Sequence, residues 1–244
     1  MKNIPDKSVD MILCDLPYGT TDCSWDTIIP LDKLWEQYER ITKDSSAIVL
    51  TASGQFVNKL IQSKITLYKY KWIWVKTRVG NFVNAKNKPM TNFEEVLVFS
   101  KGNTANGSKL KINYYPQGIT ECGIKQVKKN SRGNTIGQRI NQIGKEYMSY
   151  TNYPKDVLFF DSDATRLHPT QKPVALFEYL IKTYTNEGEI VLDNCIGSGT
   201  TAIAAINTNR QFIGIEKEEK YFDIATEIIE KLKQTLFTKL NDFR

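Results

Sequence analysis

Four consecutive residues near the start of the 244-residue chain combine groups that can hold a flat ring carrying an amine. Asp15, Leu16, Pro17 and Tyr18 follow the apolar run of residues 9–14. The carboxylate and a backbone carbonyl held by the proline can accept hydrogen bonds from an amine, and the tyrosine ring can stack on an extruded base. Alone, the aspartate would be a turn residue and the tyrosine a surface aromatic. Together they predict a site for a flipped-out nucleobase.

A second stretch has the spacing of a cofactor-binding turn. Gly197-x-Gly199-x-x-Ala202 follows the apolar run of residues 189–192, and Glu216 ends the next apolar run. In such units the glycines let the backbone approach the ligand, amides at the helix start face it, and the acidic residue accepts hydrogen bonds from ribose hydroxyls. No lysine follows the glycines, which excludes a P-loop. The pattern predicts a ribose-containing cofactor, and a plain packing turn is the alternative.

Short apolar runs that alternate with helical patterns must position these two stretches. This alternation predicts an α/β fold, with a parallel sheet and helices on both faces. The expected strands are residues 9–14, 47–51, 67–75, 95–99, 189–192 and 211–215. The expected helices are residues 31–41, 56–61, 176–181, a segment through 202–205, and 218–236.

The composition suits one catalytic domain with a basic insertion. Apolar residues make up 41% of the chain, enough for a core, and the net charge is +6. Between residues 101 and 145 there are nine basic residues and one acidic residue, a local charge of +8 that favours a polyanionic partner. The basic residues are Lys101, Lys109, Lys111, Lys125, Lys128, Lys129, Arg132, Arg139 and Lys145.

Cysteine and histidine usage argues against metal and disulfide chemistry. The cysteines at 14, 23, 122 and 195 form no CxxC pair, and the single histidine, His168, has no cysteine near it in the sequence. We therefore expect no metal site and no disulfide framework. Neither a signal segment nor an apolar run of about 20 residues is present, so we expect a cytoplasmic, reduced protein with no membrane partner.

Two polar stretches are candidates for contact with nucleic acid. Residues 102–165 lack periodicity and contain interspersed tyrosines, which favours a small recognition insertion over disorder. A solvated lid whose tyrosines pack a local core is the alternative. Residues 76–91 lie between two expected strands and contain several basic residues and Phe82. We interpret them as a DNA-contacting loop, and a solvated basic hairpin is the alternative. The interspersed tyrosines of residues 102–165 are Tyr114, Tyr115, Tyr147, Tyr150 and Tyr153.

The chain resembles the beta class of the DNA amino-methyltransferases. Residues 15–18 resemble the aspartate-proline-proline-tyrosine motif of that family, and residues 193–201 resemble its S-adenosylmethionine motif. The segment from His168 to Pro173 resembles the one that precedes the cofactor motif. In this chain the catalytic motif comes first, the recognition insertion next and the cofactor motif last, which is the order of the beta class.

The resemblance implies a Rossmann-like methyltransferase sheet with a circularly permuted motif order and a small recognition insertion. It places the catalytic half in residues 1–101, the target-recognition insertion in 102–165 and the cofactor-binding half in 166–244. It also implies that the strands ending at Asp15 and Asp193 are neighbours, so that base and methyl donor meet between them.

The resemblance also implies roles for individual residues. Asp15, Leu16, Pro17 and Tyr18 hold the target amine and base, and His168 is structural. The cofactor S-adenosyl-L-methionine is expected to contact the residues of the second motif, with Glu216 on its ribose and Lys172 closing over it. The implied cofactor-binding residues are Asp193, Cys195, Gly197, Gly199, Thr200, Thr201, Glu216 and Lys172.

Two departures from the family pattern carry expectations of their own. Leu16 replaces the first proline, which matters little if only its carbonyl acts. Relatives usually begin further upstream, with an acidic residue that contacts the cofactor adenine, whereas residues 1–5 correspond to the end of that helix. We therefore expect an adenine pocket that lacks one wall and a weakened affinity for the cofactor.

These features predict a DNA methyltransferase that acts on adenine N6 in duplex DNA, because aspartate at position 15 favours adenine. Cytosine N4 is the nearest alternative, followed by RNA or protein glutamine. A DNA-binding protein with a dead cofactor site and a dehydrogenase are the alternatives from other classes. The family resemblance also raises a homodimer and a restriction endonuclease as partners.

Overall fold

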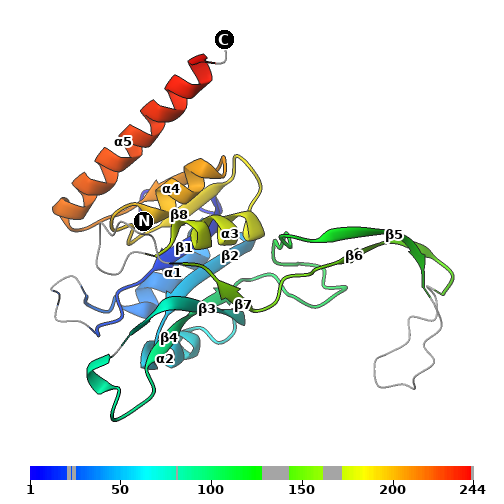
Figure 1. Cartoon of the computed structure of the whole chain (residues 1–244), viewed down its shortest axis with the longest axis horizontal. Coiled ribbons are helices and arrows are strands. Elements are labelled where there is room, and N and C mark those ends of the chain that lie inside the picture. The colour runs from blue at the N-terminus through cyan, green and yellow to red at the C-terminus, as the bar shows by residue number, and fades with distance from the viewer. Residues whose placement is uncertain (21–22, 24–25, 81, 128–142, 162–171, 243–244) are drawn as a thin grey trace. The chain divides into compact units, whose positions relative to one another are not determined.

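The sheet is organised around β1 (Val9–Asp15), which is buried on both faces and pairs in parallel with a strand on each side. The computed structural model describes residues 1–20, 23, 26–80, 82–127, 143–161 and 172–242. Its main sheet has seven strands in the order β7-β3-β4-β2-β1-β8-β9 (Figure 1). The other strands are β2 (Thr42–Ala52), β3 (Tyr68–Gly80), β4 (Thr91–Phe99), β7 (Val157–Phe159), β8 (Ile190–Asp193) and β9 (Gln211–Gly214).

The predicted parallel sheet is confirmed as a mostly parallel one, and one strand departs from the prediction. β4 runs antiparallel to both of its neighbours, β2 and β3, whereas the other pairs in the sheet are parallel. A parallel connection needs a crossover of about a dozen residues or more, usually a helix. Only residues 81–90 join β3 to β4, so the chain returns directly as an antiparallel strand. The sheet is therefore mostly parallel, with β4 reversed.

Helices cover both faces, as the sequence predicts. The helices are α1 (Leu31–Ile41), α2 (Gln55–Ser63), α3 (Val174–Tyr184), α4 (Thr200–Asn207) and α5 (Glu219–Asp242), with the short 3-10 helix η1 at Phe82–Asn84. Side chains of β1 alternate between two core clusters, because successive residues of a strand point to opposite faces. Ile12 and Cys14 pack with residues of α1 and α2, whereas Met11 and Leu13 pack with residues of α3 and α4.

A small second unit is formed by residues 116–155, inside the stretch that the sequence sets apart as an insertion. It contains the antiparallel pair β5 (Thr120–Gln126) and β6 (Glu146–Thr151). Tyr147, Tyr150 and Tyr153 are exposed on this unit, which does not fit a packed local core. Lys128, Lys129, Arg132 and Arg139 of the predicted basic cluster lie outside the described residues.

The rest of the expected insertion belongs to the main unit. The Tyr114 ring packs 6.2 Å from that of Tyr184 in α3, and the Tyr115 hydroxyl accepts a hydrogen bond from Asn186. β7 joins the edge of the main sheet beside β3. Three residues are too few to show a strand period, so sequence patterns did not reveal this strand.

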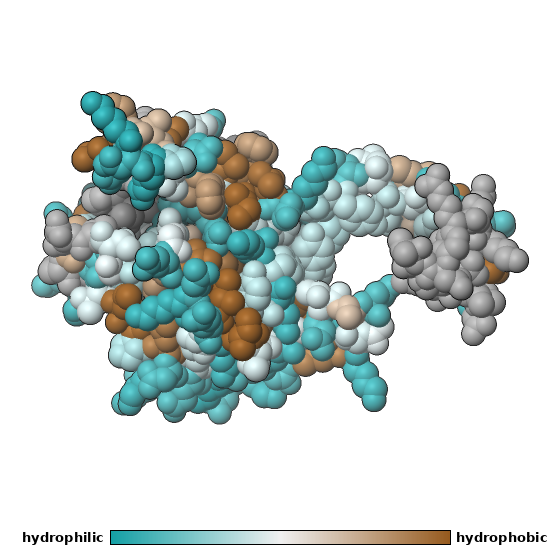
Figure 2. All heavy atoms as spheres, turned by 90° about the horizontal axis from the view of Figure 1, so that it is seen from below, coloured by the Kyte–Doolittle hydropathy of each residue, from teal (hydrophilic) through white to brown (hydrophobic). Residues whose placement is uncertain are grey.

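The described residues show neither a bilayer-crossing helix nor a metal-binding cluster. None of the described helices combines the length and apolar character that crossing a bilayer requires. No group of three or more histidine, cysteine, aspartate or glutamate side chains in the described ranges is placed to hold a metal ion. In these ranges the cysteines at 14, 23, 122 and 195 form no disulfide bond. On the face seen in Figure 2, apolar surface is interrupted by hydrophilic residues.

A buried hydroxyl joins α3 to β3 and supplies a test of the core. The Tyr184 hydroxyl accepts a hydrogen bond from the Trp72 indole N–H at 2.7 Å and lies 2.9 Å from the Tyr70 hydroxyl. Tyr184→Phe should lower the free energy of unfolding by about 1–3 kcal/mol, because the Trp72 donor stays buried without an acceptor. Tyr70→Phe is the matched control, with a smaller loss expected. Urea denaturation measures both, and equal losses would contradict this account.

Candidate active site

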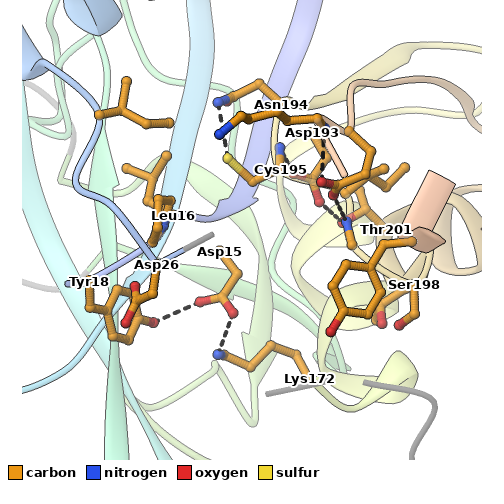
Figure 3. Close-up of a pocket in the computed structure, with 18 of the residues that line it drawn as sticks. Asp15, Leu16, Tyr18, Asp26, Lys172, Asp193, Asn194, Cys195, Ser198 and Thr201 are labelled. Carbon is orange, nitrogen blue, oxygen red and sulfur yellow. Dashed lines mark hydrogen bonds and ion pairs between the residues drawn. The ribbon is translucent and has the colours of Figure 1, made fainter. Parts of the chain in front are cut away.

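The carboxyl ends of β1 and β8 open into one pocket. Met11 pairs with Val191 and Ile12 with Leu192, so the adjacency predicted for the two strands is confirmed. Asp15 and Asp193 end these strands at the same edge of the sheet, and both line a pocket of about 610 Å³. Ligand pockets typically measure about 300–1,000 Å³. Figure 3 shows the two carboxylates on separate sides of this pocket.

Asp15 is held by hydroxyl groups on one oxygen and by an ammonium on the other. Its Oδ1 accepts hydrogen bonds from the Tyr18 hydroxyl at 2.7 Å and from the Thr51 hydroxyl. Its Oδ2 lies 2.6 Å from Nζ of Lys172, which points toward it in Figure 3. These contacts orient the carboxylate at the pocket wall.

Lys172 joins Asp15 to the buried carboxylate of Glu94. Its ammonium also lies 3.2 Å from Oε2 of Glu94, and Oε1 of Glu94 lies 2.6 Å from Nζ of Lys76. Charges therefore alternate along the row Lys76, Glu94, Lys172 and Asp15, which we call the charge row. Lys172 is only 6% exposed, so its charge depends on these partners. Burial lowers the pKa of Lys172, but Asp15 and Glu94 outweigh it, and the net pKa is raised.

Sequence reasoning missed two members of the charge row, Glu94 and Lys76. Both lie in the β3–β4 pair beside residues that were expected to be strand, and only the sheet register directs them into the pocket. The structure places Lys172 beside Asp15, with which it forms an ion pair. Its predicted closure over the cofactor stays a prediction, and His168 lies outside the described residues.

Tyr18 is a neutral, supported ring. Burial, with Asp15 and Glu94 nearby, raises the pKa of its phenol well above the ordinary value. The ring stacks on Phe56 of α2, with centroids 5.1 Å apart and an interplanar angle of 26°. Leu16 and Pro17 line the pocket with it, and the Leu16 side chain is buried in the core. An apolar side chain is thus accommodated where the family pattern has proline.

A buried aspartate anchors the chain that follows Tyr18. The backbone amides of Gly19 and Thr20 each donate to the Asp26 carboxylate, at 2.8 Å. Asp26 is buried and lines the pocket. The spacing of Asp26 from the catalytic motif carried no signal in the sequence, because the fold of this loop creates the contact.

The glycine turn follows β8 and starts α4. Gly199 is the N-cap residue of α4 in the left-handed conformation at φ +92°, and an added Cβ would lie 3.3 Å from that of Ala225 in α5. Gly197 has φ +53°, and a Cβ there would meet no protein atom within 4 Å. Gly197 lines the pocket, whereas Gly199 does not belong to its lining. Gly197 therefore leaves open space for a ligand beside the backbone, and Gly199 shapes the turn.

Asp193 is buried beneath this turn. Its Oδ1 accepts the Cys195 amide at 2.9 Å, and its Oδ2 accepts the Thr201 hydroxyl at 2.5 Å. Burial raises the pKa of Asp193 to about 6, although the bonds from Thr201 and Cys195 oppose the rise. Cys195, Thr200 and Thr201 also line the pocket. Of the predicted cofactor residues, all except Gly199 therefore line this pocket.

Glu216 follows β9 and accepts a hydrogen bond from the glycine turn. The Gly197 amide donates to its Oε2 at 2.8 Å, while the Lys217 and Glu218 amides donate to Oε1 at 2.8 and 3.0 Å. A carboxylate offers about four acceptor positions, so three amides leave room for about one further donor. Two ribose hydroxyls would therefore share Glu216 with the Gly197 amide or displace it.

Comparison with known proteins shows similarity along nearly the whole chain. A family described as DNA methylase, covering N6 and N4 enzymes, matches residues 9–227. Type II methyltransferase M.HpaI of Haemophilus parainfluenzae is 26% identical over an alignment of 241 positions that covers 93% of this chain and 70% of that protein. DNA adenine methyltransferase YhdJ of Escherichia coli is 28% identical over 242 residues, covering 91% of this chain and 76% of YhdJ.

A solved structure shares the fold. The crystal structure of the M1.HpyAVI–SAM complex matches with a TM-score of 0.57 and 24% sequence identity, covering 90% of this chain and 88% of that one. The family match includes both strand ends that form the pocket and most of the chain around them. On this evidence the chain belongs to the DNA methylase family of N6 and N4 amino-methyltransferases.

Proposed function

We propose that this protein transfers a methyl group from S-adenosyl-L-methionine to N6 of adenine in duplex DNA. The observation that carries the proposal is the shared pocket, in which the Asp15 motif and the glycine turn face one space. The first supplies acceptors and a ring for a base, and the second supplies an acidic, glycine-lined wall for a cofactor. Neither half alone requires a methyltransferase, but their union in this family does.

Asp15 holds the amine in this proposal. Oδ2 has one acceptor position engaged by Lys172, and each carboxylate oxygen has about two, so Oδ2 can accept one amine hydrogen without releasing the lysine. The Leu16 carbonyl is proposed to accept the other, while Pro17 holds the turn. When both amine hydrogens are held by these acceptors, a pyramidal nitrogen with a localised lone pair is favoured. Positioning of this kind accounts for much of the rate of a group transfer. Tyr18, supported by Phe56, is proposed to stack on the base.

The residues around the glycine turn fit the proposed cofactor. S-adenosyl-L-methionine supplies a methyl group on a sulfonium, next to an α-amino group and a ribose. Ionised Asp193 is suited to an ammonium, and the open space beside Gly197 admits a ligand close to the backbone. Glu216 is suited to at least one ribose hydroxyl. Lys172, Cys195, Thr200 and Thr201 complete the proposed cofactor wall, with Gly199 shaping its turn.

Duplex DNA is the proposed macromolecular partner. Exposed tyrosines and lysines share the unit of residues 116–155, a combination suited to bases and phosphates. We propose residues 102–165 as the target-recognition insertion between the two halves of the methyltransferase domain. A homodimer, a restriction endonuclease partner and a cytoplasmic location stay predictions. Cytosine N4 is the second candidate target, because its exocyclic amine presents the same two hydrogens to Asp15 and Leu16.

Nucleoside mass spectrometry tests the reaction and the base. Mixed-sequence duplex DNA incubated with the protein and S-adenosyl-L-methionine should yield N6-methyladenine. Asp15→Asn should lower the rate by about 10²-fold or more, because a neutral amide oxygen is a weaker acceptor than the carboxylate and does not pair with the charge of Lys172, while cofactor binding stays unchanged. N4-methylcytosine would keep the mechanism and change the base. Absence of any methylated base from the wild-type reaction would refute the proposal.

The raised pKa of Asp193 predicts a pH-dependent affinity for the cofactor. If the ionised carboxylate binds the α-amino group, the dissociation constant should be constant above about pH 6 and rise up to about tenfold per unit below it. Isothermal titration calorimetry between about pH 5 and pH 8, a range that includes the pKa of Asp193, measures this affinity. Asp193→Asn should bind weakly at every pH in this range. A wild-type profile that is flat below pH 6 contradicts the assignment.

The charge row predicts which side of the pocket depends on Lys172. Lys172→Met should lower kcat about tenfold or more and leave the cofactor dissociation constant within about twofold, because Asp15 loses its orienting ammonium. Lys172→Arg should retain more activity because it keeps the charge. Lys7→Met, which breaks the exposed pair with Asp44, is the control and should leave both constants unchanged. Weakened cofactor binding with an unchanged kcat would favour closure over the cofactor instead.

A further inference from the structure

The connection between β3 and β4 exposes apolar side chains that the core does not use. Phe82 and Val83 of η1 are 79% and 93% exposed, and Val79 and Met90 on either side are also exposed. The connection projects beyond the end of the sheet in Figure 1. Exposing a phenylalanine and a valine side by side leaves apolar surface in water, which points to a partner.

The charge around this apolar tip selects the kind of partner. From residue 77 to residue 93 the sequence contains three basic residues, Arg78, Lys86 and Lys88, and no acidic residue. Lys86 and Lys88 are exposed beside η1. An apolar pair flanked only by positive charge is complementary to DNA, which presents phosphates outside and stacked, apolar base faces inside.

The position of the tip relates it to the pocket. Its two strands carry pocket residues at their near ends, with Trp74 and Lys76 on β3 and Glu94 on β4. Residues 76 to 82 span at most about 20 Å when extended. A nucleotide held in the pocket stays bonded to its strand, so the duplex it has left must lie close to the pocket. The tip is thus placed to meet the duplex next to the extruded base.

Extruding a base leaves a gap in the stack. Unpairing and unstacking cost a few kcal/mol, and apolar side chains inserted between bases are a known way for proteins to stabilise distorted DNA. We propose that Phe82, with Val83 beside it, enters the DNA stack at the gap left by the target base, while Lys86 and Lys88 bind the flanking phosphates. The inference rests on the proposed function and adds a residue that holds the base out of the duplex.

Two duplexes that differ only opposite the target adenine test the role of Phe82. Once sequencing of methylated DNA has located the target, one duplex carries thymine opposite it and the other an abasic site, which makes extrusion easier. Phe82→Ala should lower kcat/KM about tenfold or more on the paired duplex and less than about threefold on the abasic one. Phe82→Trp should restore most of the activity. Cofactor binding should be unchanged in both variants.

A second readout follows extrusion without catalysis. With 2-aminopurine at the target position, binding of the wild-type protein should raise fluorescence as the base leaves the stack, and Phe82→Ala should reduce that rise. The Lys86→Gln/Lys88→Gln double variant is the contrast. It should weaken binding equally on both duplexes and reduce the slope of log K against log salt by roughly two, because two phosphate contacts are lost.

The outcomes separate this inference from the proposed function. Wild-type protein that methylates neither duplex refutes the proposed function, and the inference with it. Methylation by the wild type together with an unaffected Phe82→Ala, or an equal loss on both duplexes, overturns the inference alone. Loss of binding to anionic lipid vesicles in Phe82→Ala, with unchanged behaviour on both DNAs, would assign the tip to a membrane surface and also overturn it.

Discussion

The parallel pairing of β1 with β8 is the constraint on which the rest of this structure depends. It brings two segments almost 180 residues apart to the same edge of the sheet, so that Asp15 and Asp193 open into one pocket. Parallel strands place their carboxyl ends together, and ligands of open α/β sheets bind at that edge. Because β1 is buried on both faces, its register is strongly determined by packing. The relation between the two halves of the site follows from that register.

The carboxylates of Asp15 and Asp193 lie in different electrostatic surroundings. Asp15 faces an ammonium and two hydroxyl donors, so its charge has partners before any substrate arrives. Asp193 is buried with a hydroxyl and an amide, and its pKa of about 6 indicates incomplete compensation. A cationic ligand group beside Asp193 would supply the missing charge. In the proposed function, Asp15 is therefore a fixed acceptor, and a cationic group of the cofactor compensates the charge of Asp193.

The reversed direction of strand β4 determines two features of the structure, the charge row and the exposed tip. Its antiparallel return places Glu94 between Lys76 and Lys172, which extends the charge row from the sheet to Asp15. The same return produces the exposed tip at Phe82. A crossover helix in place of this short connection would remove both features. The local topology of one hairpin thus connects the support of Asp15 with the surface proposed to meet DNA.

Local chemistry was readable from the sequence, and its assembly was not. Three features could be predicted because each depends on residues that are neighbours along the chain. They are the motif at residues 15–18, the glycine turn, and the alternation of strands and helices. Glu94, Lys76 and Asp26 carry no such pattern, because strand register and loop folding bring them to the pocket. The direction of β4 and the short strand β7 were likewise decided by tertiary pairing, since hydrophobic periodicity reports which face is buried and not which neighbour a strand joins.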